Sequence, residues 1–487
     1  MTETLKHEWF GNVRKDILAG IVVALALIPE AIAFSIIAGV DPMVGLYASF
    51  CIAVIIAFAG GRPGMISAAT GAMALLMGPL VREHGLDYLF AATILTGVIQ
   101  IIFGVLKVAK VMKFIPRAVM IGFVNSLALL IFMAQVPHFL GISNMTYAFV
   151  AITLAIVYIV PRFFKGIPAP LIAIVLLTAT AIFAGLDLRT VGDLGTVTKS
   201  LPSFLIPDVP FNLETLAIIF PYSIALAIVG LTESLLTSQI VDDMTDTGSN
   251  KNREARGQGI ANFVNGFFGG MAGCAMIGQS VINVKSGGRG RLSTLTAGLF
   301  LMFLIIVLGD LVVQIPMPVL AGIMIMVSIG TFDWGSFAYL VKAPKADAAV
   351  MVVTMAIVLA THDLSKGVIA GVILSAVFFV IKISKLKIDK TMDGAKTVYR
   401  MHGQLFFASV EDFLAGIDMT VTGQDIRLDF TESHVWDDSA VAAVDKAVMK
   451  LRANGNAVTI HGLNDSSRKL LGKLALSTDS GTKLSGQ

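Results

Sequence analysis

Long apolar runs separated by short polar stretches occupy the chain as far as Lys382. A helix that crosses the hydrocarbon core of a bilayer needs about 20 apolar residues, and most of these runs approach that length. The pattern predicts an α-helical polytopic membrane protein with fourteen transmembrane segments, the shortest of which are half-helices. We expect the segments at 14–39, 42–60, 65–82, 87–106, 115–137, 145–160, 169–185, 213–239, 256–270, 278–288, 291–309, 312–330, 345–361 and 365–382.

Two of these segments are too short and too rich in glycine to span a bilayer. One lies in the stretch 270–288, where the run from Gln279 to Ser286 supplies about two helical turns. The other is 67–76, which follows the glycine-rich turn at 60–64. Backbone broken at membrane depth is tolerated only where protein surrounds it or water reaches it. Two such segments at matching places in the halves of a transporter indicate its binding site.

The segments form two series of seven, at about 14–185 and 213–382, joined by a polar loop with Pro202, Pro207 and Pro210. Because seven is odd, the second series must enter the membrane upside down relative to the first. This is the inverted repeat of secondary transporters. Most Lys and Arg residues fall on one side of this topology, and the opposite side carries Arg82, Arg189, Lys199 and Lys366. The positive-inside rule therefore predicts that both termini are cytoplasmic.

Composition agrees with a membrane protein and argues against other classes. The chain of 487 residues is 56% hydrophobic and 14% charged, with a mean hydropathy of +0.82. A net charge of +3, without basic runs between aromatic residues, does not favour nucleic-acid binding. Cys51 and Cys274 both fall in apolar segments, so we expect no disulfide framework, metal site or cofactor. No nucleophile–base set or phosphate-binding loop motif is found, and we do not expect an enzyme.

The composition becomes that of a soluble domain after Lys390. Alternation and β-branching predict strands at 397–407, 425–430 and 457–461, and apolar residues at helical spacing predict a helix at 439–453. A strand–helix–strand–helix series of this length forms a small α/β domain. The sequence thus predicts a cytoplasmic N-terminus at 1–13, a transmembrane domain at 14–390 and an α/β domain at 391–487.

Two acids fall midway along predicted transmembrane helices. Glu30 follows Pro29, which frees a backbone carbonyl and bends the helix, and Glu233 holds the equivalent place in the second series. Intramembrane carboxylates are costly, and they usually face a cavity, pair with a cation or carry protons. Thr237 lies on the same face as Glu233, and the two residues could ligate sodium or position a proton. The alternatives are structural: an acid that bonds a neighbouring helix, and a threonine that bonds the carbonyl one turn back.

The starts of the two half-helices could attract an anion. If both helices begin at the midplane, their N-terminal dipole ends converge there, with unpaired amides from 70–73 and 278–281. Glycine and alanine allow a ligand to approach the backbone, and Thr70 or Ser280 can add a hydroxyl group. The alternative is tight helix packing through small residues. Phe34, one turn after Glu30, either lines this pocket or belongs to the ordinary core.

Six stretches, in the order that the family has them, resemble the sulfate permease (SulP) family of anion transporters. They are Pro29-Glu-Ala-Ile-Ala-Phe34, Val44-Gly-Leu-Tyr-Ala-Ser49, Gly60-Gly-Arg-Pro63, the half-helix at Thr70, Thr232-Glu-Ser234 and Gln279-Ser-Val-Ile-Asn283. The region after Lys390 resembles the family's STAS domain, the sulfate-transporter and anti-sigma-factor-antagonist module. The resemblance implies a core domain, of helices 1–4 and 8–11, that moves against a gate domain, of helices 5–7 and 12–14, usually in a homodimer.

The resemblance also implies a substrate site. Carried over by position, the family's anion pocket falls on Glu30, Phe34, Gly71, Ala72, Gly278, Gln279 and Ser280. Vertebrate relatives have glutamine where Glu30 stands and arginine where Gln279 stands. This pocket therefore lacks a fixed positive charge and contains an acid, a pattern that favours uptake together with a proton.

We accordingly expect proton-coupled symport of a small anion, of the sulfate, bicarbonate or dicarboxylate class, across a bacterial inner membrane. A sodium-coupled bicarbonate or sulfate symporter and an anion exchanger or channel are the alternatives. A channel needs a continuous polar pore, whereas the relevant segments show isolated polar residues. The absence of arginine at Gln279 argues against a voltage-driven motor.

In the α/β domain, Ser439 takes the place where anti-sigma-factor antagonists carry a phosphorylatable serine. The alternative for Ser439 is an ordinary helix N-cap.

Overall fold

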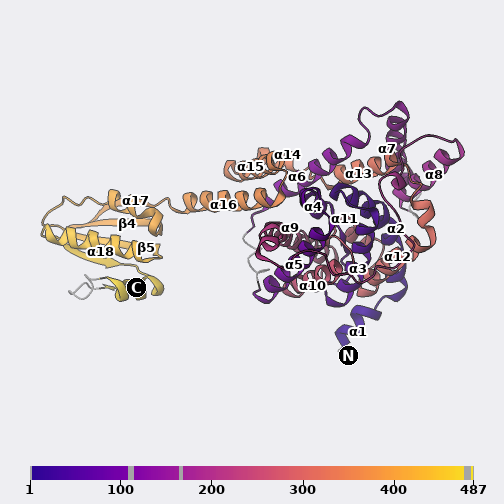
Figure 1. Cartoon of the computed structure of the whole chain (residues 1–487). Coiled ribbons are helices and arrows are strands. Elements are labelled where there is room, and N and C mark those ends of the chain that lie inside the picture. The colour runs from indigo at the N-terminus through magenta and orange to yellow at the C-terminus, as the bar shows by residue number, and fades with distance from the viewer. Residues whose placement is uncertain (1–2, 108–114, 164–167, 476–483, 486–487) are drawn as a thin grey trace. The chain divides into compact units, whose positions relative to one another are not determined.

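A computed structural model describes residues 3–107, 115–163, 168–475 and 484–485. The chain divides into two compact units, Met1–Val372 and Ile373–Gln487 (Figure 1). The division falls within α16 (Leu364–Ile383). Each unit is described by itself below.

The first unit is built almost entirely of helices, which satisfy their backbone hydrogen bonds internally, as lipid requires. Its first half contains α1 (Glu3–Phe10), α2 (Val13–Ala38), α3 (Pro42–Ala59), α4 (Gly71–His84), α5 (Leu86–Val105), α6 (Arg117–Gln135), α7 (Asn144–Phe163) and α8 (Ala169–Phe183). Its second half contains α9 (Leu213–Thr245), α10 (Lys251–Gly266), α11 (Ile277–Lys285), α12 (Arg291–Val312), α13 (Met317–Thr331), α14 (Ser336–Lys342), α15 (Lys345–Thr361) and α16.

The predicted helical membrane protein is confirmed. Within the described residues, nine spans are long and apolar enough to cross a membrane: α2, α3, α5, α6 with the turn after it, α7, α9, α12, α13 with α14, and α16. Helices also form at the other five predicted segments, but α4, α8, α10, α11 and α15 are shorter, with 14, 15, 16, 9 and 17 residues. The count of fourteen transmembrane segments therefore remains a prediction.

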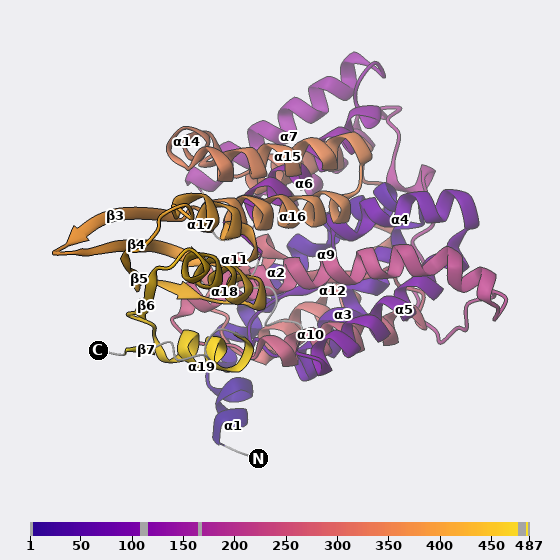
Figure 2. The same ribbon diagram turned by 90° about the vertical axis from the view of Figure 1, so that its left-hand side faces the viewer.

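The helices of the first unit pack in two groups. The core group consists of α2–α5 with α9–α12, and the gate group contains α6–α8 with α13 and α15. Figure 2 shows α6, α7 and α15 together, apart from α3, α5 and α10. Each group takes helices from both halves of the sequence, as expected of interleaved repeats. The groups meet where α4 contacts α6 and where α2 contacts α13.

Two short strands pair inside the core group. β1 (Ser67–Ala69) runs antiparallel to β2 (Gly273–Ala275), with Ala68 opposite Cys274. Every residue of both strands is buried. β1 leads directly into α4 and β2 into α11, so each strand carries its chain into the interior, where a short helix begins.

Buried amide side chains of α10 hold this strand pair in place. The side chain of Asn262 accepts from the Gly273 N–H at 2.9 Å and donates to the Gly273 carbonyl at 3.0 Å, as a neighbouring strand would. It also donates to Gln100 on α5 at 2.9 Å. Gln258 donates to the Ser67 hydroxyl at 2.6 Å on the other strand. Because buried backbone groups need partners, these amides make a two-stranded sheet tolerable inside a helical core.

The second unit contains a five-stranded sheet in the order β3-β4-β5-β6-β7. Its strands are β3 (Lys387–Asp393), β4 (Lys396–Leu405), β5 (Asp425–Val435), β6 (Ala457–His461) and β7 (Leu484–Ser485), and its helices are α17 (Val410–Gly416), α18 (Asp438–Ala453) and α19 (Asp465–Leu474). β3 is antiparallel to β4, and the other pairs are parallel. Its own apolar core includes Tyr399, Phe413 and Phe430. The predicted α/β domain is confirmed.

The elements that were not expected from the pattern include the helices α1, α14 and α17 and the strands β1, β2, β3 and β7. β3 begins at Lys387, before the expected boundary between 390 and 391. Its sequence KIDKTMD offers little apolar alternation, since most of its residues are exposed on an edge strand. Residues 476–483 and 486–487 of the expected α/β domain lie outside the described residues.

Candidate functional site

α4 begins inside the core group without a side-chain cap. Its N-cap residue, Thr70, has extended backbone angles, but its hydroxyl group does not bond the first turn of the helix. The Oγ1 atom instead lies 3.2 Å from the Sγ atom of Cys274 on β2. The first N–H groups of a helix have no intrahelical partner, so those of Gly71, Ala72 and Met73 are not used within α4.

α11 starts in the same manner. Its N-cap residue, Met276, makes no side-chain cap, and its own N–H donates to the Ile66 carbonyl at 2.9 Å. Ser280 donates the first N–H bond of the helix, to the Met276 carbonyl at 3.0 Å. The preceding amides, including those of Gly278 and Gln279, are therefore left for another acceptor.

Open space adjoins the start of α11. Gly278 is exposed, although Met276 and Gln279 beside it are only 5% and 3% exposed. A Cβ atom built on Gly278 would meet nothing within 4 Å. No protein atom therefore covers this part of the backbone, and its role in binding a ligand stays a prediction.

The start of α4 is much more closely packed. A Cβ atom on Gly71 would lie 2.9 Å from Cε1 of Phe34 and 3.0 Å from Cδ1 of Ile131. Phe34 therefore does face a half-helix start, while Ala72 is fully buried. Ile131 comes from α6 of the gate group. Sequence reasoning missed it because one isoleucine in an apolar helix carries no signal.

Glu30 lies beside the start of α11. It stands in α2, which continues as a helix through Pro29, and its carboxyl group interacts with the side chain of Gln279. Glu30 is partly accessible, whereas the residues on either side of it, Pro29 and Ala31, are buried. Within the described residues, neither Glu30 nor Glu233 forms an ion pair with Lys, Arg or His. The site thus has helix N-termini and acids but no paired cation.

Glu233 of α9 contacts the strand β2. Its Oε2 atom accepts from the Cys274 thiol at 2.9 Å. The Thr237 hydroxyl donates to the Glu233 backbone carbonyl at 2.7 Å, which is the structural alternative considered for this threonine. That Cys274 joins Glu233 to Thr70 could not be predicted from the sequence, because this contact depends on the register of β1 and β2.

Ser280 differs in its contacts from a ligand-binding hydroxyl. Its Oγ atom accepts from the Ile66 N–H at 3.0 Å and lies 3.4 Å from the Ile66 carbonyl, to which it donates. Ser280 therefore ties α11 to the residue before β1. Its contribution to a ligand would come through the helix that it positions.

The glycine-rich turn before β1 is held by a buried ionic cluster. Arg62, 8% exposed, lies with its Nε atom 3.3 Å from Asp242 of α9, and Lys251 lies 2.7 Å from the same carboxylate. Glu254 of α10 accepts the N–H groups of Gly61 and Arg62 at 2.7 and 3.0 Å. The sequence identified the turn, but it did not reveal its partners, which lie more than 170 residues away.

Ser439 is exposed at the start of α18. The N-cap residue there is Asp437, whose side chain accepts from the Ala440 N–H at 2.9 Å. The alternative of Ser439 as an N-cap was therefore wrong, because Asp437 takes that role and the helix begins at the next residue, Asp438. The hydroxyl group of Ser439 remains accessible.

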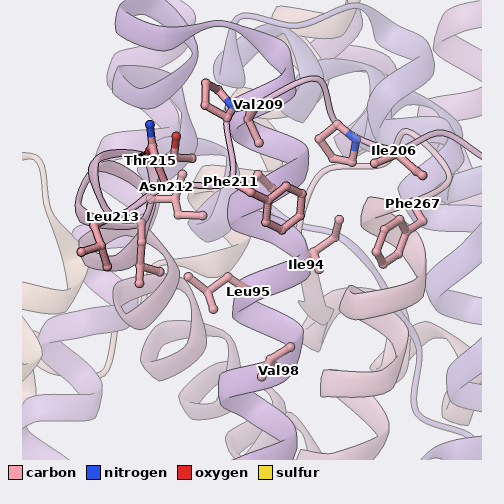
Figure 3. Close-up of a pocket in the computed structure, with 15 residues that line it drawn as sticks. Ile94, Leu95, Val98, Ile206, Val209, Phe211, Asn212, Leu213, Thr215 and Phe267 are labelled. Carbon is pink, nitrogen blue, oxygen red and sulfur yellow. Dashed lines mark hydrogen bonds between the residues drawn. The ribbon is translucent and has the colours of Figure 1, made fainter.

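Apolar cavities lie away from the half-helix starts. Figure 3 shows one of about 470 Å³ between α5 and residues 206–216, lined by Ile94, Leu95, Val98, Ile206, Val209, Phe211 and Phe267 among others. Its lining is almost entirely apolar, and the side chain of Asn212 caps α9 by accepting from the Thr215 N–H at 2.8 Å. An anion would find no charge and few donors there, so we place the candidate site at α4 and α11.

Comparison with protein-family models gives two matches. The sulfate permease family model matches residues 13–354, and the STAS domain model matches residues 387–485. The second match begins at the first residue of β3.

Individual relatives agree with these matches. The chain is 63% identical to the "Putative sulfate transporter YbaR" of Bacillus subtilis, over 97% of this chain and 99% of the relative. It is 30% identical to the bicarbonate transporter BicA of a Picosynechococcus species, over 78% of this chain and 72% of the relative.

Solved structures show the same likeness. The transmembrane domain of a cyanobacterial BicA has a TM-score of 0.66 at 29% identity, covering 74% of this chain and 98% of that one. Murine Slc26a9, an anion transporter in an inward-facing state, has a TM-score of 0.84 and covers 96% of this chain and 88% of that one. At 18% identity, the second likeness concerns the fold alone.

Proposed function

This chain belongs to the sulfate permease family, and from that premise we propose that it imports a small inorganic anion, or a dicarboxylate, by proton-coupled symport. The names of its relatives favour sulfate or bicarbonate as the substrate. The protein is a multi-pass membrane transporter, and no cofactor is part of the proposal.

The observation that carries this proposal is the pair of uncapped half-helix starts. Thr70 and Met276 are both N-cap residues without a side-chain cap, and they follow two strands that pair with each other. Helix N-termini bind anions through free N–H groups and the positive end of the helix dipole. The anion would lie between Phe34 and Glu30 of α2, Thr70, Gly71 and Ala72 at α4, and Gly278, Gln279 and Ser280 at α11.

Glu30 is the proposed proton-coupling group. It is an acid on a membrane-spanning helix, beside a site that otherwise attracts anions, and a charged side chain at membrane depth is costly. An arriving anion repels the carboxylate and makes protonation more favourable, so the proton and the anion each aid the binding of the other. In a site without lysine or arginine, a bound proton supplies the charge that a bound anion needs.

Sodium coupling is the second candidate mechanism, with Glu233 and Thr237 as the ligands. Its support is the carboxyl group of Glu233, which contacts Cys274 of β2 and forms no ion pair with Lys, Arg or His within the described residues. An exchanger or a channel would need neither ion gradient. These mechanisms differ in the gradient that drives accumulation, which makes them separable in one assay.

The experiment is flux of labelled sulfate, bicarbonate and a dicarboxylate into proteoliposomes with an inward proton gradient, an inward sodium gradient or neither. We expect accumulation above equilibrium with the proton gradient alone. Accumulation that follows sodium supports the second mechanism, and flux that only dissipates an anion gradient supports a channel. If no tested anion moves under any gradient, the proposed function is wrong.

The proposal extends to the setting of the protein. We expect it in the plasma membrane of a bacterium, with both termini and the STAS domain in the cytoplasm, and as a homodimer. Phosphorylation of Ser439 would place a doubly charged group beside Asp437 and Asp438. Because these like charges repel one another, we expect phosphorylation to weaken any binding that involves the start of α18.

A further inference from the structure

A hydrogen-bonded chain of three side chains connects the start of α4 with the acid of α9. The Sγ atom of Cys274 lies 2.9 Å from Oε2 of Glu233 and 3.2 Å from Oγ1 of Thr70. Thr70, Cys274 and Glu233 are 3%, 0% and 8% exposed. Water therefore has little access to the three groups, and they must satisfy one another.

The protonation state of Glu233 determines the direction of this chain. An ionised carboxylate can only accept hydrogen bonds, so the single proton of the Cys274 thiol must point to Glu233. The sulfur then has only an acceptor role left, and the Thr70 hydroxyl must donate to it. In this arrangement Thr70 has no proton to offer to an anion at the start of α4.

A proton on Glu233 reverses the chain. The new O–H group of Glu233 donates to sulfur, and the Cys274 thiol then donates to Oγ1 of Thr70. The Thr70 hydroxyl proton is freed, beside the unpaired N–H groups of Gly71 and Ala72. One O–H bond forms, on Glu233, and every other change is a rotation of a hydroxyl or thiol group.

We infer that Cys274 is a positioning residue that couples protonation of Glu233 to anion binding at the start of α4. The inference rests on the proposed function, because it uses the anion site at the half-helix starts. It adds a second proton site and assigns a role to a cysteine that no family motif quoted above includes. By linkage, a bound anion that holds the Thr70 proton also favours the protonated form of Glu233.

The electrostatic surroundings of Glu233 favour this coupling. Within the described residues, Cys274 is the one titratable group in contact with the Glu233 carboxyl group. The other described titratable side chains on the helices packed against α9 form no hydrogen bond or ion pair with the carboxyl group of Glu233. They are Arg82, Glu83 and His84 of α4, Asp87 and Tyr88 of α5, Lys251, Arg253, Glu254 and Arg256 of α10, and Lys285 of α11.

A double-mutant cycle on the full chain tests the inference, with equilibrium binding of labelled inorganic sulfate at a pH where carboxyl groups are ionised. Glu233→Gln mimics the protonated acid, since its amide can donate to sulfur. We expect it to raise sulfate affinity by about 5-fold or more when Cys274 is present, the lower end of ordinary site–site coupling. In a Cys274→Ala background the same change should alter affinity by less than about 2-fold. Cys274→Ser, which keeps a donor and an acceptor, should restore most of the effect.

Equal effects of Glu233→Gln in the native and Cys274→Ala backgrounds would overturn the inference. If Glu233→Gln fails to fold, the pH dependence of sulfate binding is compared between Cys274→Ser and Cys274→Ala. A response through Glu30 is common to both variants, so a steeper response in Cys274→Ser supports the chain and coincident curves reject it. If the native chain binds neither sulfate, bicarbonate nor a dicarboxylate, the proposed function fails and this inference with it, which is distinct from native binding without coupling.

Discussion

The two half-helix starts are alike in backbone and different in surroundings. Both follow a buried three-residue strand, and both lack a side-chain cap. At α11, a Cβ atom on Gly278 would have open space, whereas at α4 a Cβ atom on Gly71 would press on Phe34 and Ile131. Both halves therefore share a strand that leads into an uncapped helix with free N–H groups, but they differ in the space beside those groups.

This difference assigns distinct roles to the two starts. α11 has room for a ligand and lies beside Glu30 through Gln279. α4 touches the gate group through Ile131 and touches Glu233 through Thr70 and Cys274. We therefore expect the α11 start to hold most of the anion's surface and the α4 start to respond to movement of the gate group.

The largest effect is expected from substitutions that block the free N–H groups that the two starts share. Gly278→Asp and Gly71→Asp each place a negative charge against the free N–H groups, where it takes the place of the anion and repels it. Two like charges about 4 Å apart at an effective dielectric of about 20 cost roughly 4 kcal/mol, or about a 1000-fold loss of affinity. Sulfate uptake in proteoliposomes should be abolished in both variants.

Gly472→Asp is the matched control for this pair. Gly472 is an exposed glycine of α19 in the second unit, and a Cβ atom there would meet nothing within 4 Å. Its uptake should equal that of the native chain. Unimpaired uptake by a correctly folded Gly278→Asp or Gly71→Asp variant would show that the anion site lies elsewhere.

The shared features could be predicted from the sequence, and the differences could not. Short glycine-rich segments in matching places predicted both half-helices, and length and apolar periodicity predicted the helices around them. The space beside Gly71 depends on Phe34 and Ile131, which come together only through packing of α2, α4 and α6. The bond between Thr70 and Cys274 likewise depends on a strand register between residues 204 positions apart.

The next largest effect is expected from Glu30, the acid beside the start of α11, and it should concern proton coupling and not anion binding. Glu30→Gln resembles the permanently protonated state, so the variant should keep sulfate binding while losing acceleration by an inward proton gradient. A coupling free energy of about 1–3 kcal/mol corresponds to an acceleration of about 5- to 150-fold, and the part of it that passes through Glu30 should disappear. The measurement is initial uptake with and without the gradient.

Glu30→Asp is the control, since it keeps a titratable group at the same position. It should retain a proton-driven component, although a shorter side chain will reduce it. Full proton-driven uptake by Glu30→Gln would transfer the coupling role to Glu233 or to no acid, and the position of Glu30 beside Gln279 would then be structural.

A smaller effect measures the difference in space directly. Gly71→Ala should weaken sulfate binding by about 10-fold, because overpacking costs about 1–3 kcal/mol and must displace Phe34, Ile131 or the start of α4. Gly278→Ala should change binding by less than about 2-fold, since its methyl group meets no protein atom. Binding isotherms of the two variants, measured side by side, provide the test.

Ile131→Val offers a rescue for the crowded start. It removes the Cδ1 atom that a Cβ on Gly71 would meet at 3.0 Å, so Gly71→Ala with Ile131→Val should recover part of the lost affinity. A Gly71→Ala variant that binds like the native chain would contradict the close packing described for α4, and a strongly impaired Gly278→Ala would contradict the open space at α11.

The smallest effect on both starts is expected from removal of the second unit. A chain that ends after Lys385 keeps α16 to its last residue, Ile383, and removes β3 and everything after it. The apolar core of the second unit is formed from its own residues, among them Tyr399, Phe413 and Phe430, so its loss uncovers no half-finished core in the first unit. The truncated chain should be monodisperse in mild detergent and should bind sulfate within about 3-fold of the native affinity, whatever its transport rate. The Gly71→Ala and Gly278→Ala substitutions should keep their unequal effects in it.

Aggregation of the truncated chain, under conditions where the full chain remains monodisperse, would show that the transmembrane unit needs the STAS domain to fold. A truncated chain that stays folded but binds sulfate far more weakly would show instead that the STAS domain helps to set the geometry of the two starts, and the comparison between them would then have to be made in the full chain alone.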